Sequence, residues 1–187
     1  MPSMPVDPIT IFRTAEFFYH GNLALGQKIP KAHVYVLPYT VLGALALELY
    51  FKCLIAIETG ANPPRGHNLK ALFDRISEDG QSKIQERFDN PNPAEADWRE
   101  RCKNPPPNMP EDIDLTFKFE GVLRRSARAF ERFRYVYEDT GLPGEFAWEA
   151  NYIIYCTRLH IIQDHRPEWG RQNTAQSPGA LPTSPTQ

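Results

Sequence analysis

The residues best suited to bind phosphate groups lie in the segment LRRSARAFERFR. Arg124, Arg128 and Arg132 are four residues apart, which places them on one face if the segment is helical. Spaced guanidinium groups pair well with phosphates, so this face is a candidate nucleic-acid-binding surface. The alternative is an ordinary solvated helix face, because Glu120 and Glu131 stand nearby.

A second group of candidates is the pair of charges inside the apolar stretch ALELYFKCLIAIETG. Glu48 and Lys52 are one helical turn apart and can therefore pair with each other. A buried charge without a partner is costly, so we interpret the pair as structural. Arg134, which lies between two aromatic residues, is a candidate further partner for Glu48 or Glu138.

The remaining side chains suggest no metal or cofactor chemistry. His67 directly precedes Asn68, an expected helix cap, and we predict that it bonds the loop or packs on the preceding helix. Carboxylates and histidines are not clustered at metal-ligand spacing, and there is no glycine-rich phosphate loop or recognisable nucleophile. We therefore expect no metal and no cofactor.

Helical segments must position all these residues, because apolar side chains recur at three- and four-residue intervals and prolines separate the segments. No strand pattern or internal repeat is present. The prediction is an all-α, up-and-down bundle of four to five helices in one domain, residues 1–167. A proline-rich surface excursion is expected at 89–112, with one turn near 94–101, and a disordered polar tail at 168–187. The helices are predicted at about residues 8–25, 38–60, 68–77, 112–139 and 145–164, with a shorter one at 78–88.

Composition favours a soluble cytoplasmic protein. The chain has 187 residues, 41% of them hydrophobic, and a net charge of −2, so no global positive field attracts nucleic acid. Its three cysteines match no zinc or redox motif, which favours reduced thiols. The N-terminus does not resemble a signal peptide, and the longest apolar stretch, residues 41–57, is interrupted by charges and is a poor membrane span.

Two neighbouring segments resemble the HEPN superfamily. In LGALALELYFKCLIAIETG, Glu and Lys lie four apart on an apolar helix, and HNLKALFDRIS follows after a short loop. HEPN proteins commonly show this arrangement, with His-x-Leu-x-x-Leu-Phe opening the second helix. AFERFRYVYE also resembles a stretch found in uncharacterised bacterial members. The resemblance covers about residues 36–80 and 114–165 and implies a HEPN-like bundle of four or five helices.

The resemblance also implies a candidate catalytic pair. Many HEPN proteins are metal-independent ribonucleases whose active site combines an Arg with a His four to six residues further on, across a dimer. In RLHIIQDH, Arg158 and His165 have six residues between them, on the expected late helix. His165 would move a proton and Arg158 would stabilise charge on the phosphate. Leu159 departs from the polar residue usual after the Arg, and Arg13 and His20 have the same spacing on the first helix.

Two functions remain open on this reading. The first is a HEPN-like protein of an RNA-linked, defence or toxin–antitoxin system, acting as a metal-independent endoribonuclease. The second is a non-enzymatic HEPN-like module that binds a protein partner or a nucleotide. The resemblance implies a homodimer, with RNA and an antitoxin or nucleotidyltransferase-type protein as candidate partners, and no membrane.

Overall fold

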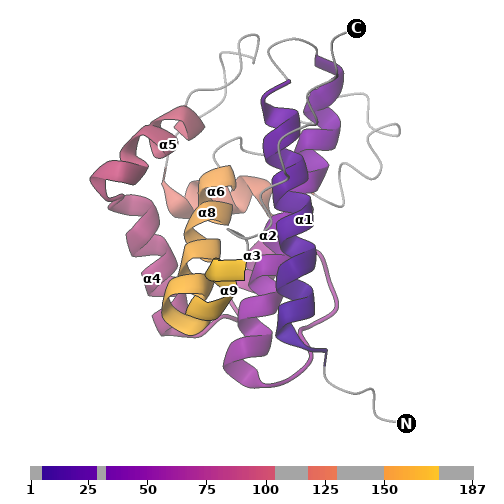
Figure 1. Cartoon of the computed structure of the whole chain (residues 1–187), viewed down its shortest axis with the longest axis vertical. Coiled ribbons are helices and arrows are strands. Elements are labelled where there is room, and N and C mark those ends of the chain that lie inside the picture. The colour runs from indigo at the N-terminus through magenta and orange to yellow at the C-terminus, as the bar shows by residue number, and fades with distance from the viewer. Residues whose placement is uncertain (1–5, 29–32, 104–117, 130–149, 173–187) are drawn as a thin grey trace, which may run out of the picture.

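The computed structural model describes residues 6–28, 33–103, 118–129 and 150–172. Within these ranges the chain forms helices and no strand, which confirms the predicted all-α class. The elements pack around one apolar core to which nearly every helix contributes. Figure 1 shows two long helices at one side, α4 and α5 at the other, and α8 between them.

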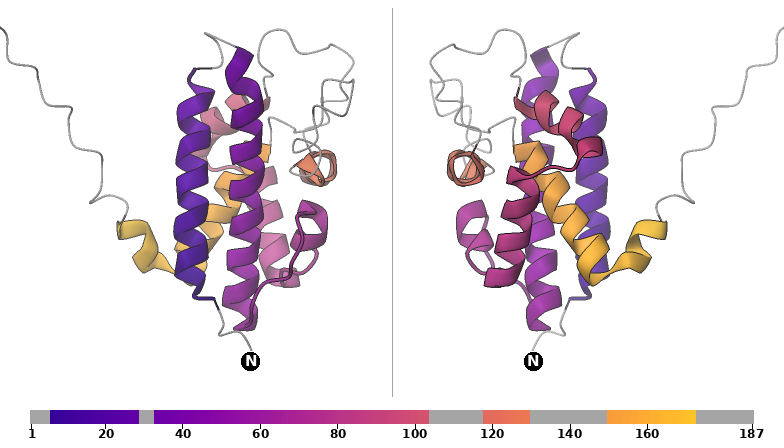
Figure 2. Two further views of the ribbon diagram at one scale, coloured as in Figure 1. Left: turned by 90° about the vertical axis from the view of Figure 1, so that its right-hand side faces the viewer. Right: turned by 90° about the vertical axis from the view of Figure 1, so that its left-hand side faces the viewer.

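A hairpin of two long antiparallel helices forms one side of the bundle, α1 at Pro8–Gly26 and α2 at Val36–Thr59 (Figure 2). Pro8 starts α1, where a missing N–H is harmless, and the Asp7 carboxylate accepts the backbone N–H of Ile9. A 3-10 turn, η2 at His33–Tyr35, leads into α2. Gly60 ends α2 in the left-handed conformation with φ 66°, as expected for a glycine after a helix.

Helix α2 is the centre of the core. Its aromatic and aliphatic side chains Tyr50, Phe51 and Leu54 are fully buried. It is the one helix in the described ranges that is long and apolar enough to cross a membrane, and 67% of its apolar window is buried inside the protein. A helix at the centre of a core can match a membrane span in length and hydropathy, because it too is apolar on nearly all sides.

Two shorter helices follow the loop after α2, α3 at Leu69–Phe73 and α4 at Glu78–Asp89. Each begins with a side-chain cap, as the sequence predicts for Asn68. Asn68 Oδ1 accepts the N–H of Ala71 at 3.0 Å, and Ser77 Oγ accepts the N–H of Gly80 at 3.1 Å.

The proline-rich segment contains more structure than the single turn predicted for it. Helix α5 spans Pro93–Lys103 and contacts α8. Glu95 of this helix is buried, and the side chain of its Arg99 donates to the Phe88 carbonyl at 2.9 Å. The first part of the excursion therefore covers the bundle, whereas residues 104–117 lie outside the described ranges.

The long helix predicted for residues 112–139 is interrupted where it can be followed. Helix α6 spans Phe119–Ser126, and Lys118 before it is extended, with φ −110° and ψ 140°. The Ala127 carbonyl accepts the N–H of Leu69, the first residue of α3, at 2.8 Å. This hydrogen bond satisfies a carbonyl group just after α6 and the first N–H group of α3. Helix termini leave such groups without partners inside the helix.

The last predicted helix, at about residues 145–164, is described from residue 150 as α8 at Ala150–His160 and η3 at Ile161–His165. A further helix, α9 at Pro167–Gln172, follows it. The turn η3 is π-helical, with the Arg166 N–H bonded to the Ile161 carbonyl at 2.8 Å. Pro167 therefore begins a helix instead of only ending one. Residues 168–172, expected in a disordered tail, are helical, and Trp169 packs on Phe12 with ring centroids 5.1 Å apart.

Candidate functional site

Arg158, the first member of the predicted catalytic pair, is held by a carboxylate of α1. Its Nε and Nη2 donate to the two carboxylate oxygens of Glu16 at 2.6 and 3.0 Å. Both side chains are largely buried, with 17% and 8% of their surface exposed. Burial lowers the pKa of Arg158, but the hydrogen bonds and charge of Glu16 outweigh burial and raise it above its ordinary value. The guanidinium is a fixed cation bound in a two-point pair.

The same carboxylate serves two further side chains. The Tyr50 hydroxyl of α2 donates to Glu16, and burial followed by the Glu16 charge raises the pKa of Tyr50 well above its ordinary value. His20 Nε2 lies 3.7 Å from Glu16 Oε2. Glu16 therefore joins α1, α2 and α8, and His20 lies beside the same carboxylate that holds Arg158.

His165 belongs to a different cluster. Its Nε2 lies 3.2 Å from Nε2 of His160, and the rings meet edge to face. Burial, followed by the charge of His160, lowers the pKa of His165. The π turn explains why His165 and Arg158 have different partners. It inserts about one extra residue, which rotates the following side chains by roughly 100° about the helix axis.

The π turn also brings together side chains that the sequence reading left apart. His160, His165 and Glu58 each offer one ligand atom, and these atoms all lie within 4.8 Å of one another. The Nδ1 of His160 lies 2.6 Å from the Asp164 carboxylate. The expectation that histidines and carboxylates do not gather at ligand spacing is therefore wrong, because two histidines five residues apart adjoin only in a π turn and Glu58 comes from α2.

Glu58 is positioned at the end of α2 by the start of α4. Its carboxylate oxygens accept the backbone N–H and the hydroxyl of Ser77, each at 2.8 Å. Gly80 leaves the space that this carboxylate needs, since a Cβ there would stand 2.7 Å from Glu58 Oε1. Glu58 is thereby positioned at the junction of α2, α4 and η3.

The structural pair predicted on α2 has a third member from the following loop. Lys52 Nζ donates to Glu48 Oε1 at 2.7 Å, and His67 Nδ1 lies 3.0 Å from Glu48 Oε2. Glu48 is 4% exposed. His67 thus contacts the preceding helix, as predicted. Arg134, the predicted further partner of Glu48 or Glu138, lies outside the described residues.

The basic surface is only partly described. Arg124 and Arg128 are exposed, and Arg132 lies outside the described ranges. Helix α6 ends at Ser126, so a turn separates Arg124 from Arg128. The phosphate-binding surface therefore stays a prediction.

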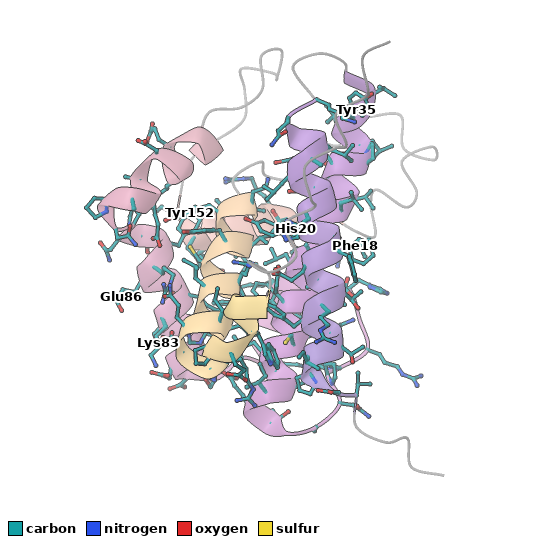
Figure 3. All side chains as sticks on the ribbon, viewed as in Figure 1. Phe18, His20, Tyr35, Lys83, Glu86 and Tyr152 are labelled. Atoms are coloured by element: carbon teal, nitrogen blue, oxygen red, sulfur yellow. The ribbon has the colours of Figure 1, made fainter. Side chains whose placement is uncertain are left out.

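Apolar side chains are exposed along the α1–α2 hairpin. Phe17 is 79% exposed and Val34 is 74% exposed, and Val36 and Leu37 are each 39% exposed. In Figure 3, the neighbouring Phe18 and Tyr35 lie on the side of the hairpin away from α4 and α5. Phe17 lies midway along α1, and the other three lie in η2 and at the start of α2. These four exposed residues of the hairpin, Phe17, Val34, Val36 and Leu37, are called the hairpin patch below.

Comparisons with known proteins leave the family of the chain open. No family model matches it, and neither the curated proteins nor the solved structures give a significant match.

The sequence analysis did not predict a role for Glu58 or Asp164, or the contact between His160 and His165. A usable signal was present in HIIQDH, where an Asp lies four residues after the first His. That spacing predicts a pair on one helical face. No comparable signal connects Glu58 to this segment, because the contact depends on how α2 and α8 pack.

The Glu48 cluster predicts a specific pattern of stability. Glu48→Ala should lower the free energy of unfolding by about 3 kcal/mol, because it leaves the Lys52 charge partly buried without its partner. The double variant Glu48→Leu with Lys52→Met should recover most of this loss. Denaturant unfolding followed by circular dichroism measures both effects. Glu86→Ala, on the exposed face of α4 (Figure 3), is the control and should change stability by less than about 0.5 kcal/mol. Equal effects of Glu48→Ala and Glu86→Ala would contradict the structural role.

Tyr50 predicts a stability difference that depends on pH. Tyr50→Phe should lower the free energy of unfolding by about 1.5 kcal/mol near neutral pH, because it removes a hydrogen bond to a charged group. The raised pKa means that above about pH 10 the unfolded chain loses the Tyr50 proton while the folded protein keeps it. The wild type therefore loses stability there that the variant does not lose, and the difference should shrink. A constant difference between about pH 8 and pH 11 would refute the assignment.

Proposed function

We propose that this protein is a HEPN-like helical interaction module that works by association and not as a ribonuclease through Arg158 and His165. The observation that carries the proposal is the two-point pair between Arg158 and Glu16. A guanidinium that stabilises a phosphate in a transition state must be able to face that phosphate. Here Glu16 already neutralises the Arg158 guanidinium. A phosphate that displaced Glu16 would leave the Glu16 carboxylate buried without its main partner, which is costly.

The hairpin patch supports association as the function. Phe17 and Val34 are among the most exposed large apolar side chains in the described ranges. Large aromatic side chains contribute strongly to protein interfaces, where their burial removes apolar area from water. We propose a second copy of the chain as the occupant, since the resemblance to HEPN proteins implies a dimer.

The setting of the protein is proposed from the same arguments. Reduced cysteines fit a cytoplasmic location, and Cys53 and Cys156 are both buried. An RNA-linked, defence or toxin–antitoxin system is the context that the resemblance implies, with an antitoxin or nucleotidyltransferase-type protein as the heterologous partner. Nucleotide binding by the same module is a variant of this proposal.

The second candidate, a metal-independent endoribonuclease, retains two supporting observations. His165 is partly exposed, so solvent can reach it, and Arg124 and Arg128 are exposed cations available to a phosphate backbone. A homodimer could also bring residues of two chains into one active site, as the resemblance implies.

Self-association should depend on the hairpin patch. The full-length wild type should sediment as a dimer at concentrations of tens of micromolar, and Phe17→Glu should weaken the dimer by about tenfold or more, because a charge would be placed in an apolar contact. Ser82→Glu, an exposed change on α4, is the matched control and should leave the dimer unchanged. A monomeric wild type, or a dimer that tolerates Phe17→Glu, would overturn the patch as its interface.

Ribonuclease activity should be absent. Full-length wild type and His165→Ala should leave single-stranded and structured RNA equally intact in the presence of EDTA. Reaction products separated on a denaturing gel measure this. RNA cleavage by the wild type that is lost in His165→Ala would reject the non-enzymatic module in favour of the endoribonuclease.

A further inference from the structure

We propose that Glu58, His160 and His165 form a binding site for a divalent transition-metal ion of the zinc type. The three side chains come from the end of α2, the end of α8 and the π turn, and their ligand atoms lie within 4.8 Å of one another. Imidazole nitrogens and a carboxylate oxygen form a donor set suited to zinc. This site goes beyond the proposed interaction module and does not depend on it.

The two histidines already have the separation that a shared ion would require. Their Nε2 atoms lie 3.2 Å apart and face each other. Two nitrogens bound to one tetrahedral zinc at 2.0–2.1 Å stand about 3.3 Å apart. An ion could therefore take the place of the proton between the rings with little movement of either side chain.

The protonation of His160 also prepares its Nε2 for a metal. The Nδ1 of His160 lies 2.6 Å from Asp164 Oδ2, so Nδ1 carries the proton and Nε2 presents its lone pair. A carboxylate behind a histidine is the usual second partner of a metal-binding imidazole, because it fixes the ring and its tautomer. His160 is fully buried, which fixes its ring further. Asp164 is therefore assigned as the positioning residue of the site.

Glu58 supplies the third ligand from a separate part of the chain. Ser77 holds its carboxylate through two hydrogen bonds of 2.8 Å, and a carboxylate retains further lone pairs for a cation. A shift of Glu58 by less than about 2 Å would bring an oxygen to tetrahedral spacing from both histidines. Three protein ligands leave a fourth position for water or another small ligand.

The charges around the cluster are balanced before an ion binds. Glu58 and Asp164 are anionic, and Asp79 is close enough to interact electrostatically with both histidines. Arg87 Nη2 lies 3.6 Å from Asp164, and the charge of Arg166 acts on His165. Lys83 Nζ lies 2.8 Å from Asp79, and its charge also acts on Asp164. Three cations thus oppose three carboxylates, and the geometry of the three ligand atoms carries the proposal.

A hydrogen-bonded histidine pair without any metal is the competing explanation, with His165 Nε2–H donating to His160. The two explanations differ in their response to zinc. Full-length protein freed of metal with EDTA and then dialysed should bind one equivalent of ZnCl2 in isothermal titration calorimetry, with a dissociation constant in the micromolar range or below. Asp164→Asn should weaken binding by about 10- to 100-fold, because it removes the carboxylate behind His160.

Ligand variants and controls make the experiment decisive. His165→Ala and Glu58→Gln should each reduce zinc affinity by at least about tenfold. Glu58→Gln retains an acceptor for Ser77, so a folding defect is avoided. His67→Ala, which removes a histidine from the Glu48 cluster, should bind zinc like the wild type. Zinc should also raise the unfolding temperature of the wild type and of His67→Ala but not that of His165→Ala.

Two outcomes would overturn the site. The first is a wild type that binds no zinc, and the second is equal zinc binding by the wild type, His165→Ala and Glu58→Gln, which would place the ion elsewhere. Sedimentation of the same samples in EDTA reports on the hairpin patch separately, so failure of one proposal leaves the other intact.

Discussion

The need to bury α2 on nearly all sides is the constraint on which the rest of the structure depends. A helix that is apolar all round must be surrounded by other elements, and α1, α3 and α8 all contact it. Any polar group on such a helix is carried into the bundle with it. Each of these groups must then find a partner, because a buried polar atom without one is destabilising.

Three polar side chains of α2 show how this requirement organises the fold. Glu48 is satisfied by Lys52 and by His67 from the following loop. Tyr50 donates to Glu16, and Glu16 holds Arg158. Glu58 accepts from Ser77 at the start of α4 and lies beside the two late histidines. Each of the three therefore ties α2 to a different segment, and together they set the positions of α1, α4 and α8.

This arrangement changes the meaning of the late arginine and histidine. An Arg and a His two turns apart on a straight helix would share one face and could act on one phosphate. The π turn separates them, so that Arg158 packs inward on α1 and His165 turns toward His160 and Glu58. The arginine thereby becomes part of the packing between helices, and the two histidines lie beside the carboxylate of Glu58 at the end of α2.

The amino-acid sequence by itself determined α1, α2, α3 and α4 and the residues that cap them, because apolar periodicity, prolines and capping residues act over a few neighbouring positions. The α1–α2 hairpin, the Asn68 cap, Gly60 and the Glu48–Lys52 pair were all predictable on that basis. The break after Ser126, the π turn at Ile161–His165 and α9 were not, since each depends on contacts between distant segments, such as the bond from Leu69 to Ala127 and the packing of Trp169 on Phe12. Tertiary structure also decided the partners of the charged groups. Glu16 and Arg158 are 142 residues apart, and burial selects such a pairing only when the helices have come together.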